Sequence, residues 1–302
     1  MIQRKPRAAD KMLTRSCRGE GARGTGRRYT VVLALAAAGA LAAGGIALAS
    51  ATSTVPGFSF APNSPHSVFT QGQLSLHTQT SYTGSTRSTR IQLFLDDDFQ
   101  FNPNSVPKCS AADLSGSLTM MQAMQKCGPP AGAAKNAWLL PASSSTSNGT
   151  AQFDFPSPQR TACVLVFNGQ GPASELLLFI RARVTTPGPI YCGSPTTNTD
   201  GDGTALLKGN LRANPAIGAD YTDPDNCSAA PDPRRGCQID INMIDSAVPF
   251  LTDLSFRIKR GSYVRARCVD PPAGNRQWNL QAKFTYVDPA SSETVPKSQG
   301  CT

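Results

Sequence analysis

The chain has 302 residues, which is enough for a leader and one β domain of ordinary size. Its formal net charge is +9, and residues 1–30 hold nine of the 29 basic residues but only two of the 20 acidic ones. The remainder therefore has 20 basic and 18 acidic residues, which argues against a nucleic-acid partner, because such binding needs clustered positive charge on the folded domain.

An uncharged, mostly apolar run at residues 31–49 follows the basic leader. Its length lies between that of a signal-peptide core and that of a membrane-spanning helix. Small residues at positions 47, 49 and 51 offer the small-x-small pattern that signal peptidase reads. We interpret residues 31–51 as a cleaved signal peptide, with an uncleaved N-terminal anchor as the alternative. Either way, we expect an extracytoplasmic domain, secreted or anchored, that meets a membrane only through this segment.

Residues 52–70 are rich in Ser, Thr and Pro, and we expect a linker or an extended segment leading into the domain. From 71 to 302 the sequence reads as a single β-rich domain, in which short β-type runs recur between turn-rich stretches. This pattern predicts an antiparallel β-sandwich or a barrel-like sheet. The predicted strands are 73–82, 91–95, 151–155, 163–167, 176–184, 206–211, 239–244, 254–258, 263–268 and 278–287.

Two details concern the C-terminal part. The runs 254–259 and 263–268 alternate apolar and polar residues on either side of Arg260-Gly261-Ser262, which predicts an antiparallel hairpin. The stretch 278–287 alternates over its whole length, which predicts one face in a core and one in water. The tail after residue 287 has no strand pattern of its own.

Cysteine usage supports export. One of the nine cysteines, Cys17, lies in the leader, and an even number behind an export segment is typical of disulfides. A zinc site would need closely spaced pairs such as C-x-x-C, which are absent. The cysteines of the domain are Cys109, Cys127, Cys163, Cys192, Cys227, Cys237, Cys268 and Cys301.

The stretch 110–127 is predicted to be a helical insertion. One straight helix there would hold Cys109 and Cys127 about 27 Å apart at 1.5 Å per residue, whereas a disulfide needs Cα atoms within about 7 Å. Ser115-Gly116-Ser117 offers a break. We therefore predict a short helical turn, a break and a second helix over 118–126, with Cys109 bonded to Cys127.

Eight cysteines allow 105 connectivities, so their order alone does not settle the pairing. For the remaining cysteines we therefore take neighbours in the sequence as the expected pairs. Cys227–Cys237 would close a proline-rich loop, and Cys268–Cys301 would tie down the C-terminal tail. Cys163–Cys192 is the pair that remains.

A resemblance rests on the order of several short motifs. They are Val106-Pro107-Lys108-Cys109-Ser110, a helical stretch, Cys127-Gly128, many strands, Tyr263-Val264-Arg265-Ala266-Arg267-Cys268, Trp278…Tyr286 and a final Cys301. Over residues 90–302 this resembles uncharacterised secreted, β-rich, disulfide-containing proteins of high-GC Gram-positive bacteria, a family of unknown function. The resemblance implies location and fold, and it implies no activity.

Catalytic motifs are weak. There is no G-x-S-x-G elbow, and we interpret His66 and His77 as surface residues. Asp96-Asp97-Asp98 follows an apolar strand, but adjacent carboxylates point in different directions, so we interpret these residues as a solvated turn. Asn148 and Asn226 begin glycan-acceptor sequons that carry no weight in a bacterial chain. We assign no catalytic residue.

One loop could bind calcium. Asn198, Asp200 and Asp202 fall at positions 1, 3 and 5 of an EF-hand-type loop, with glycine at position 6. The twelfth position is Gly209 rather than the bidentate Glu. We therefore favour a simple Asp/Gly turn over a calcium site, and we expect no other cofactor.

These patterns favour a non-enzymatic secreted or cell-envelope β domain with a binding, adhesive or structural role. Its partner would be a cell-wall or extracellular ligand. The alternatives are a secreted hydrolase whose catalytic residues are dispersed along the sequence and a calcium-stabilised adhesion module. A deep pocket with convergent Asp, Arg or Tyr side chains would favour the hydrolase. A flat exposed face with aromatic side chains would favour binding.

Overall fold

The computed structural model describes residues 51–83, 86–96, 98–129, 135–153, 160–171, 174–185, 189–212, 238–243, 251–269, 276–287 and 290–302. The leader, the apolar run and the expected Cys227–Cys237 pair lie outside these residues. Within the described ranges, no helix is long and apolar enough to cross a membrane.

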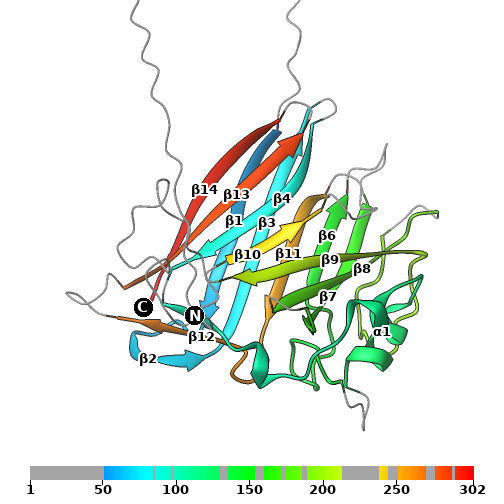
Figure 1. The fold of residues 1–302 in the computed structure, drawn as a ribbon, viewed down its shortest axis with the longest axis horizontal. Coiled ribbons are helices and arrows are strands. Elements are labelled where there is room, and N and C mark those ends of the chain that lie inside the picture. Colours follow the sequence, from blue (N-terminus) through cyan, green and yellow to red (C-terminus); the bar gives the residue numbers. More distant parts are fainter. Residues whose placement is uncertain are drawn as a thin grey trace, which may run out of the picture. The chain divides into compact units, whose positions relative to one another are not determined.

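The predicted class is confirmed: the fold is mainly β and antiparallel (Figure 1). One nearly closed sheet has eleven strands in the order β1-β3-β11-β6-β7-β8-β9-β10-β4-β13-β14, and a small sheet has the order β2-β12-β5. The strands are β1 Ala51–Ala61, β2 His66–Gln71, β3 Gln73–Tyr82, β4 Arg87–Leu95, β5 Phe99–Phe101, β6 Gly149–Phe153, β7 Arg160–Gly169, β8 Glu175–Ala182, β9 Gly203–Arg212, β10 Gln238–Asn242, β11 Leu251–Ile258, β12 Val264–Cys268, β13 Gln277–Val287 and β14 Ser291–Gly300. The helices are η1 Pro103–Ser105, η2 Ala111–Leu114 and α1 Met120–Cys127.

The large sheet curls around one apolar core. Strand β13 follows the predicted alternation, with Trp278, Leu280, Phe284 and Tyr286 buried in that core. The Trp278 ring meets the edge of Phe60 from β1, with ring centroids 5.3 Å apart. Strands from both ends of the sheet therefore share the same interior.

Strand β8 is buried on both faces. Leu176, Leu178 and Ile180 face the core inside the sheet, whereas Leu177 and Phe179 face a second apolar cluster on the outside. A strand covered on both sides needs no polar face, which explains the continuous apolar run in this part of the sequence. It also implies an outer layer, which carries the candidate site.

Three sequence expectations are corrected. Residues 52–70 are extended, as one of the two alternatives had it, but they are not a linker, because they supply most of β1 and β2, with Phe58 and Phe60 buried in the core. The tail contains β14, which pairs with β13 along its whole length. The predicted 254–268 hairpin is wrong: β11 lies in the large sheet between β3 and β6, whereas β12 crosses to the small sheet between β2 and β5.

The two ends of the large sheet meet at a seam, where β1 faces β14. All neighbouring strands in this sheet are antiparallel, so its odd number of strands makes β1 and β14 run parallel. Side chains bridge the seam. Glu293 Oε2 accepts a hydrogen bond from the Ser53 backbone N–H at 2.7 Å, and Gln299 Oε1 accepts one from the Phe60 N–H at 2.7 Å. These two side chains satisfy amides on the outer edge of β1.

We expect Glu293→Ala to lower the free energy of unfolding by about 1–3 kcal/mol, because the buried Ser53 N–H loses its acceptor. Urea unfolding measures the change, and hydrogen exchange at the Ser53 amide should become faster. Thr294→Ala, at the exposed neighbouring position, is the control and should change little. Equal stability of both variants would contradict the role of Glu293 in the seam.

Candidate functional site

An outer layer covers β7 and β8. It consists of η2, α1, the segment 135–140 and the loop 189–203, which we call the Tyr191 loop. Together with the outer face of β7 and β8 it forms one buried cluster, which comprises Cys109, Leu114, Met120, Ala123, Met124, Cys127, Ala137, Trp138, Leu140, Cys163, Leu165, Phe167, Leu177, Phe179 and Ile190. Backbone hydrogen bonds join its parts, for example Met121 N–H to Asn198 C=O at 2.9 Å. The layer is therefore one packed unit rather than a set of separate loops.

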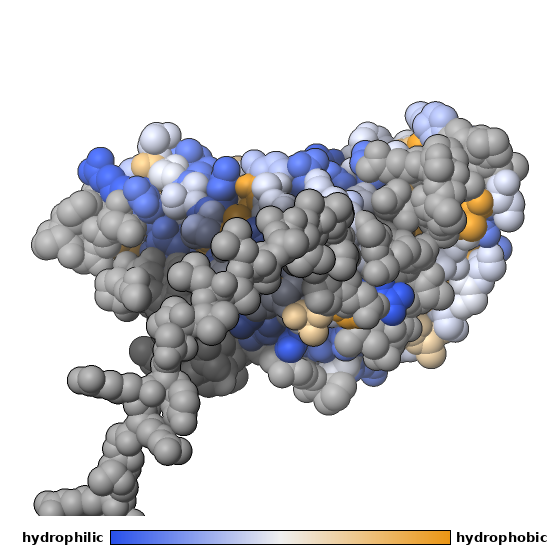
Figure 2. Space-filling model, turned by 90° about the horizontal axis from the view of Figure 1, so that it is seen from above, coloured by the Kyte–Doolittle hydropathy of each residue, from blue (hydrophilic) through white to orange (hydrophobic). Residues whose placement is uncertain are grey.

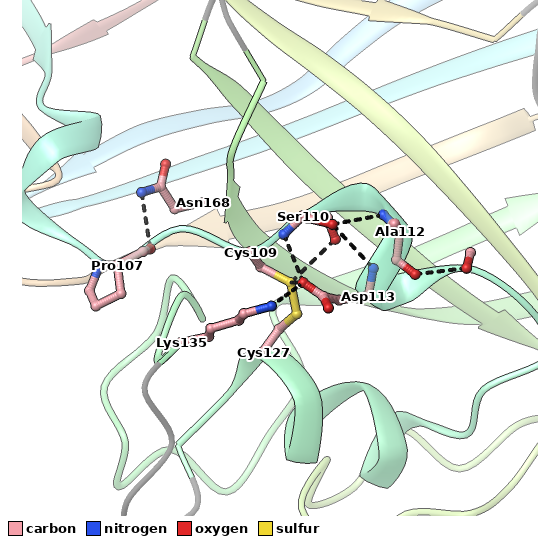
Figure 3. The surroundings of a disulfide bond; sticks show 9 residues. Pro107, Cys109, Ser110, Ala112, Asp113, Cys127, Lys135 and Asn168 are labelled. Carbon is pink, nitrogen blue, oxygen red and sulfur yellow. Dashed lines mark hydrogen bonds and ion pairs between the residues drawn. A yellow bond between two sulfur atoms is a disulfide. The ribbon is translucent and has the colours of Figure 1, made fainter.

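The helical insertion turns back as predicted. Helix η2 ends before Gly116, whose φ of +85° is a conformation that glycine adopts readily. Thr119 then begins α1 with a capping box. The Cα atoms of Cys109 and Cys127 lie 5.6 Å apart and the two residues form the expected disulfide (Figure 3). The break thus lets one bond hold both ends of the insertion.

Figure 3 shows polar groups beside this disulfide. Ser110 and Asp113 form a capping box on η2, and Lys135 Nζ lies 2.6 Å from Asp113 Oδ2. The hydrogen bond from Lys135 is the main reason that the pKa of Asp113 lies below its ordinary value. Among the described residues, only Cys109, Asp113 and Cys127 bring three potential metal-ligand atoms together. Because the two sulfurs are bonded to each other, neither is a thiolate, and this cluster fastens the insertion.

Two more disulfides match the expected pairs. Cys163 on the outer face of β7 bonds to Cys192 in the Tyr191 loop, with Cα atoms 5.4 Å apart. Cys268 of β12 bonds to Cys301, with Cα atoms 6.5 Å apart, and ties the chain end after β14 to the small sheet. The first of these bonds fixes the Tyr191 loop directly to the large sheet.

The candidate calcium residues form hydrogen bonds within the protein. The Asp200 carboxylate accepts from the Tyr191 N–H at 3.0 Å and from Arg183 Nε at 2.8 Å. Asp202 accepts from the backbone N–H groups of Val184 and Thr185. Asn198 donates to the Tyr191 carbonyl at 2.5 Å and accepts from the Asp200 N–H at 2.7 Å. In this structure the three side chains hold the backbone of the loop and its neighbours.

The two aspartates hold two exposed apolar residues. Tyr191 is 74% exposed and Val184 is 37% exposed. Each of them has its backbone N–H fixed by one aspartate, Asp200 for Tyr191 and Asp202 for Val184. The neighbours of Tyr191 in the chain are the buried Ile190 and the bonded Cys192. The backbone of an exposed tyrosine is therefore fixed between two anchored residues. Sequence reasoning missed this residue.

The pH dependence of stability should report on this arrangement. The pKa of Asp200 is lowered chiefly by the Tyr191 N–H and further by Arg183. A lowered folded-state pKa means that the charged form stabilises the fold above the ordinary value of about 3.9, and that this contribution is lost as the pH falls through the lowered value. We expect wild type to be more stable than Asp200→Asn at pH 7 and the difference to shrink by pH 2–3. Urea unfolding across that range checks this, and a constant difference would contradict it.

A small cavity lies between α1 and the Tyr191 loop. Its volume is about 180 Å³, and it is lined by Met121, Met124, Gln125, Pro129 and Thr196. Pockets for small-molecule ligands usually have about 300–1,000 Å³. This cavity has room for a side chain. Its lining includes no Asp, Arg or Tyr, the side chains whose convergence in a deep pocket would favour a hydrolase.

The histidines are held by protein groups. His77 Nε2 lies 2.8 Å from Asp253 Oδ2 on the outer face of β3 and β11, and Gln79 donates to the same oxygen. His66 lies within hydrogen-bond distance of the Ala266 carbonyl. The His77–Asp253 pair was missed because 176 residues separate its members. The alternation of β11 places Asp253 outward, but the register that brings it near His77 is not readable from one sequence.

The interpretation of Asp96–Asp98 as a solvated turn is wrong for the two residues that are described. Asp96 is 0% exposed and Asp98 is 5% exposed. Asp96 accepts from the Asn279 backbone N–H, and Asp98 accepts from Arg267 Nε at 2.6 Å. Buried carboxylates need such partners, so Asp96 fastens the start of β13 and Asp98 fastens the end of β12.

No protein-family model matches the chain, and the comparisons with curated proteins and with solved structures found no match.

Proposed function

We propose that this chain is a non-enzymatic extracytoplasmic domain, secreted or held at the cell envelope, that binds a cell-wall or other extracellular ligand. Three disulfides in the described residues are compatible with an oxidising compartment. The resemblance to secreted proteins of high-GC Gram-positive bacteria and the apolar run behind a basic leader support the same location.

The observation that carries a binding role is the Tyr191 loop. Loops on a rigid scaffold are the usual carriers of recognition, and here a disulfide and two aspartates fix the loop. A fixed loop that carries an exposed ring loses less conformational entropy on binding than a flexible loop would. A fixed loop backbone would serve little purpose if the aromatic side chain it carries met only solvent.

The partners of the ionisable groups support the non-enzymatic part. His77 pairs with Asp253, Arg267 with Asp98, and Arg90 with the buried Asp240. Each pair bridges two strands of one sheet or joins a strand to the segment beside it. These are stabilising positions, and none of these groups lines the small cavity beside α1.

Co-sedimentation tests the proposal. The full chain should sediment with envelope fragments of the producing bacterium, and Tyr191→Ala should sediment less. Val68→Ala is a matched control, because Val68 is 69% exposed but lies on β2. Failure of the wild type to sediment would overturn the proposal. Turnover of ester or glycoside substrates that disappears in His77→Ala would establish the hydrolase instead.

A further inference from the structure

We propose that Tyr191, together with the Arg183–Asp200 ion pair beside it, is a carbohydrate-binding platform. This inference rests on the proposed binding role and names its ligand class. It uses the ring, the glycine that the ring lies against, and the charged pair that holds the backbone of Tyr191.

The ring has a prepared position. It lies against Gly193, where an added Cβ would be only 2.5 Å from Tyr191 Cζ and 2.7 Å from its hydroxyl oxygen. Any larger residue at position 193 would therefore push the ring away. Contact with a glycine on one side and 74% overall exposure leave most of the aromatic surface open to solvent. The ring is thus supported without being covered.

The charged pair supplies polar groups beside the backbone of Tyr191. Arg183 Nη2 lies 2.8 Å from Asp200 Oδ1, and the side chains of the pair are 34% and 22% exposed. Asp200 also accepts from the Tyr191 N–H, so the pair sits directly beside the backbone that carries the ring. A carboxylate has acceptor sites for several donors, and a guanidinium has five N–H donors. Asp200 Oδ1 already accepts from Arg183 and from the Gly201 N–H, whereas Oδ2 accepts from the Tyr191 N–H, so Oδ2 can accept a further hydroxyl.

This combination matches the chemistry of a sugar. A pyranose presents C–H groups on one face and hydroxyls around its rim, so it can pack on an aromatic ring while its hydroxyls bond to charged neighbours. A folded protein partner would need roughly 800 Å² of surface on each side with an apolar centre. The coloured part of the face in Figure 2 is mostly hydrophilic or neutral, with hydrophobic residues in small separate spots. Among the described residues, only Val68, Val184 and Tyr191 are exposed large hydrophobics.

The test uses the full chain and named probes. Wild type, Tyr191→Ala, Tyr191→Phe, Gly193→Val and Val68→Ala are sedimented with insoluble chitin, cellulose and xylan, and with envelope fragments before and after protease treatment. We expect binding to at least one polysaccharide and to protease-treated fragments. Tyr191→Ala should weaken it about tenfold, as loss of an aromatic contact does. Tyr191→Phe and Val68→Ala should bind like wild type, and Gly193→Val should bind weakly while its fold, checked by circular dichroism, is intact.

The possible failures are distinguishable. Binding to untreated fragments that protease abolishes, with no binding to polysaccharides, would overturn the carbohydrate inference and leave the proposed binding role standing. Polysaccharide binding that is equal in wild type, Tyr191→Ala and Gly193→Val would overturn the assignment of the site. Failure to bind untreated fragments as well as polysaccharides would overturn both proposals.

Discussion

Replacing Asn148 with alanine is expected to lower the free energy of unfolding by about 3–5 kcal/mol, because one buried amide satisfies two buried N–H groups and a partly buried carbonyl. Asn148 Oδ1 accepts from Trp138 Nε1 at 2.6 Å and from the Val166 N–H at 2.9 Å. Its Nδ2 donates to the Arg257 carbonyl at 2.9 Å. Each group left unpaired in the interior costs about 1–3 kcal/mol. Chemical denaturation of the purified chain measures the effect.

The control for this variant is Asn104→Ala, since Asn104 is exposed in η1 and its loss should change stability by less than about 0.5 kcal/mol. A loss below 1 kcal/mol for Asn148→Ala would contradict the role of this amide. Asn148 is only 2% exposed, so the sequon at this position is not available for glycosylation in the folded chain. The amide instead joins β7, β11 and the segment that carries Trp138.

Replacing both Cys163 and Cys192 with alanine is expected to cost about 3–4 kcal/mol, because the closed loop restricts the unfolded chain. It should also release the Tyr191 loop, so that amide hydrogen exchange at residues 189–203 becomes faster. Calorimetry and hydrogen exchange measure the two effects. Unchanged exchange in the loop would contradict the view that this disulfide fixes it.

The double variant of Cys268 and Cys301 is a matched control. Its cysteines are separated by 33 residues, against 29 for Cys163 and Cys192, so the effect on the unfolded chain should be nearly equal. Its bond lies between the small sheet and the chain end. We expect a similar loss of stability, unchanged exchange at 189–203 and unchanged ligand binding. This separates loosening of the Tyr191 loop from general destabilisation.

Much of the fold could be predicted where a single local rule decides the outcome. Strand β13 has one buried face, so its alternation is visible in the sequence. The insertion was predictable because helix length and disulfide reach are incompatible without a break at Gly116. The apolar run of β8 indicated a strand, but its double burial depends on a layer contributed by distant segments.

Other elements depend on long-range pairing. Strand β14 alternates exposed and partly buried residues, none of them fully buried and most of them polar, so it has no apolar stripe and is ordered by its pairing with β13. In β1, a register shift between Thr54 and Gly57 interrupts the alternation, and Ser and Thr occupy many positions. Residues 254–268 alternate like a hairpin, but alternation does not specify which strand is the neighbour. In this fold the neighbours of β11 come from elsewhere in the chain.

The candidate site shows the same limit. Asn198, Asp200 and Asp202 were recognised as a structured acidic loop, but spacing cannot tell a metal ion from backbone amides as the partner of a carboxylate. Tyr191 carried one usable signal, its position next to Cys192. Its exposure follows only from the tertiary structure.

Disulfide mapping tests directly whether disulfides fasten the outer layer and its Tyr191 loop to the face formed by β7 and β8. The full chain is digested without reductant, and linked peptides are identified by mass spectrometry. We expect Cys109 to be linked to Cys127 and Cys163 to Cys192. A link from Cys192 to any other cysteine, or a free thiol at Cys163, would contradict it.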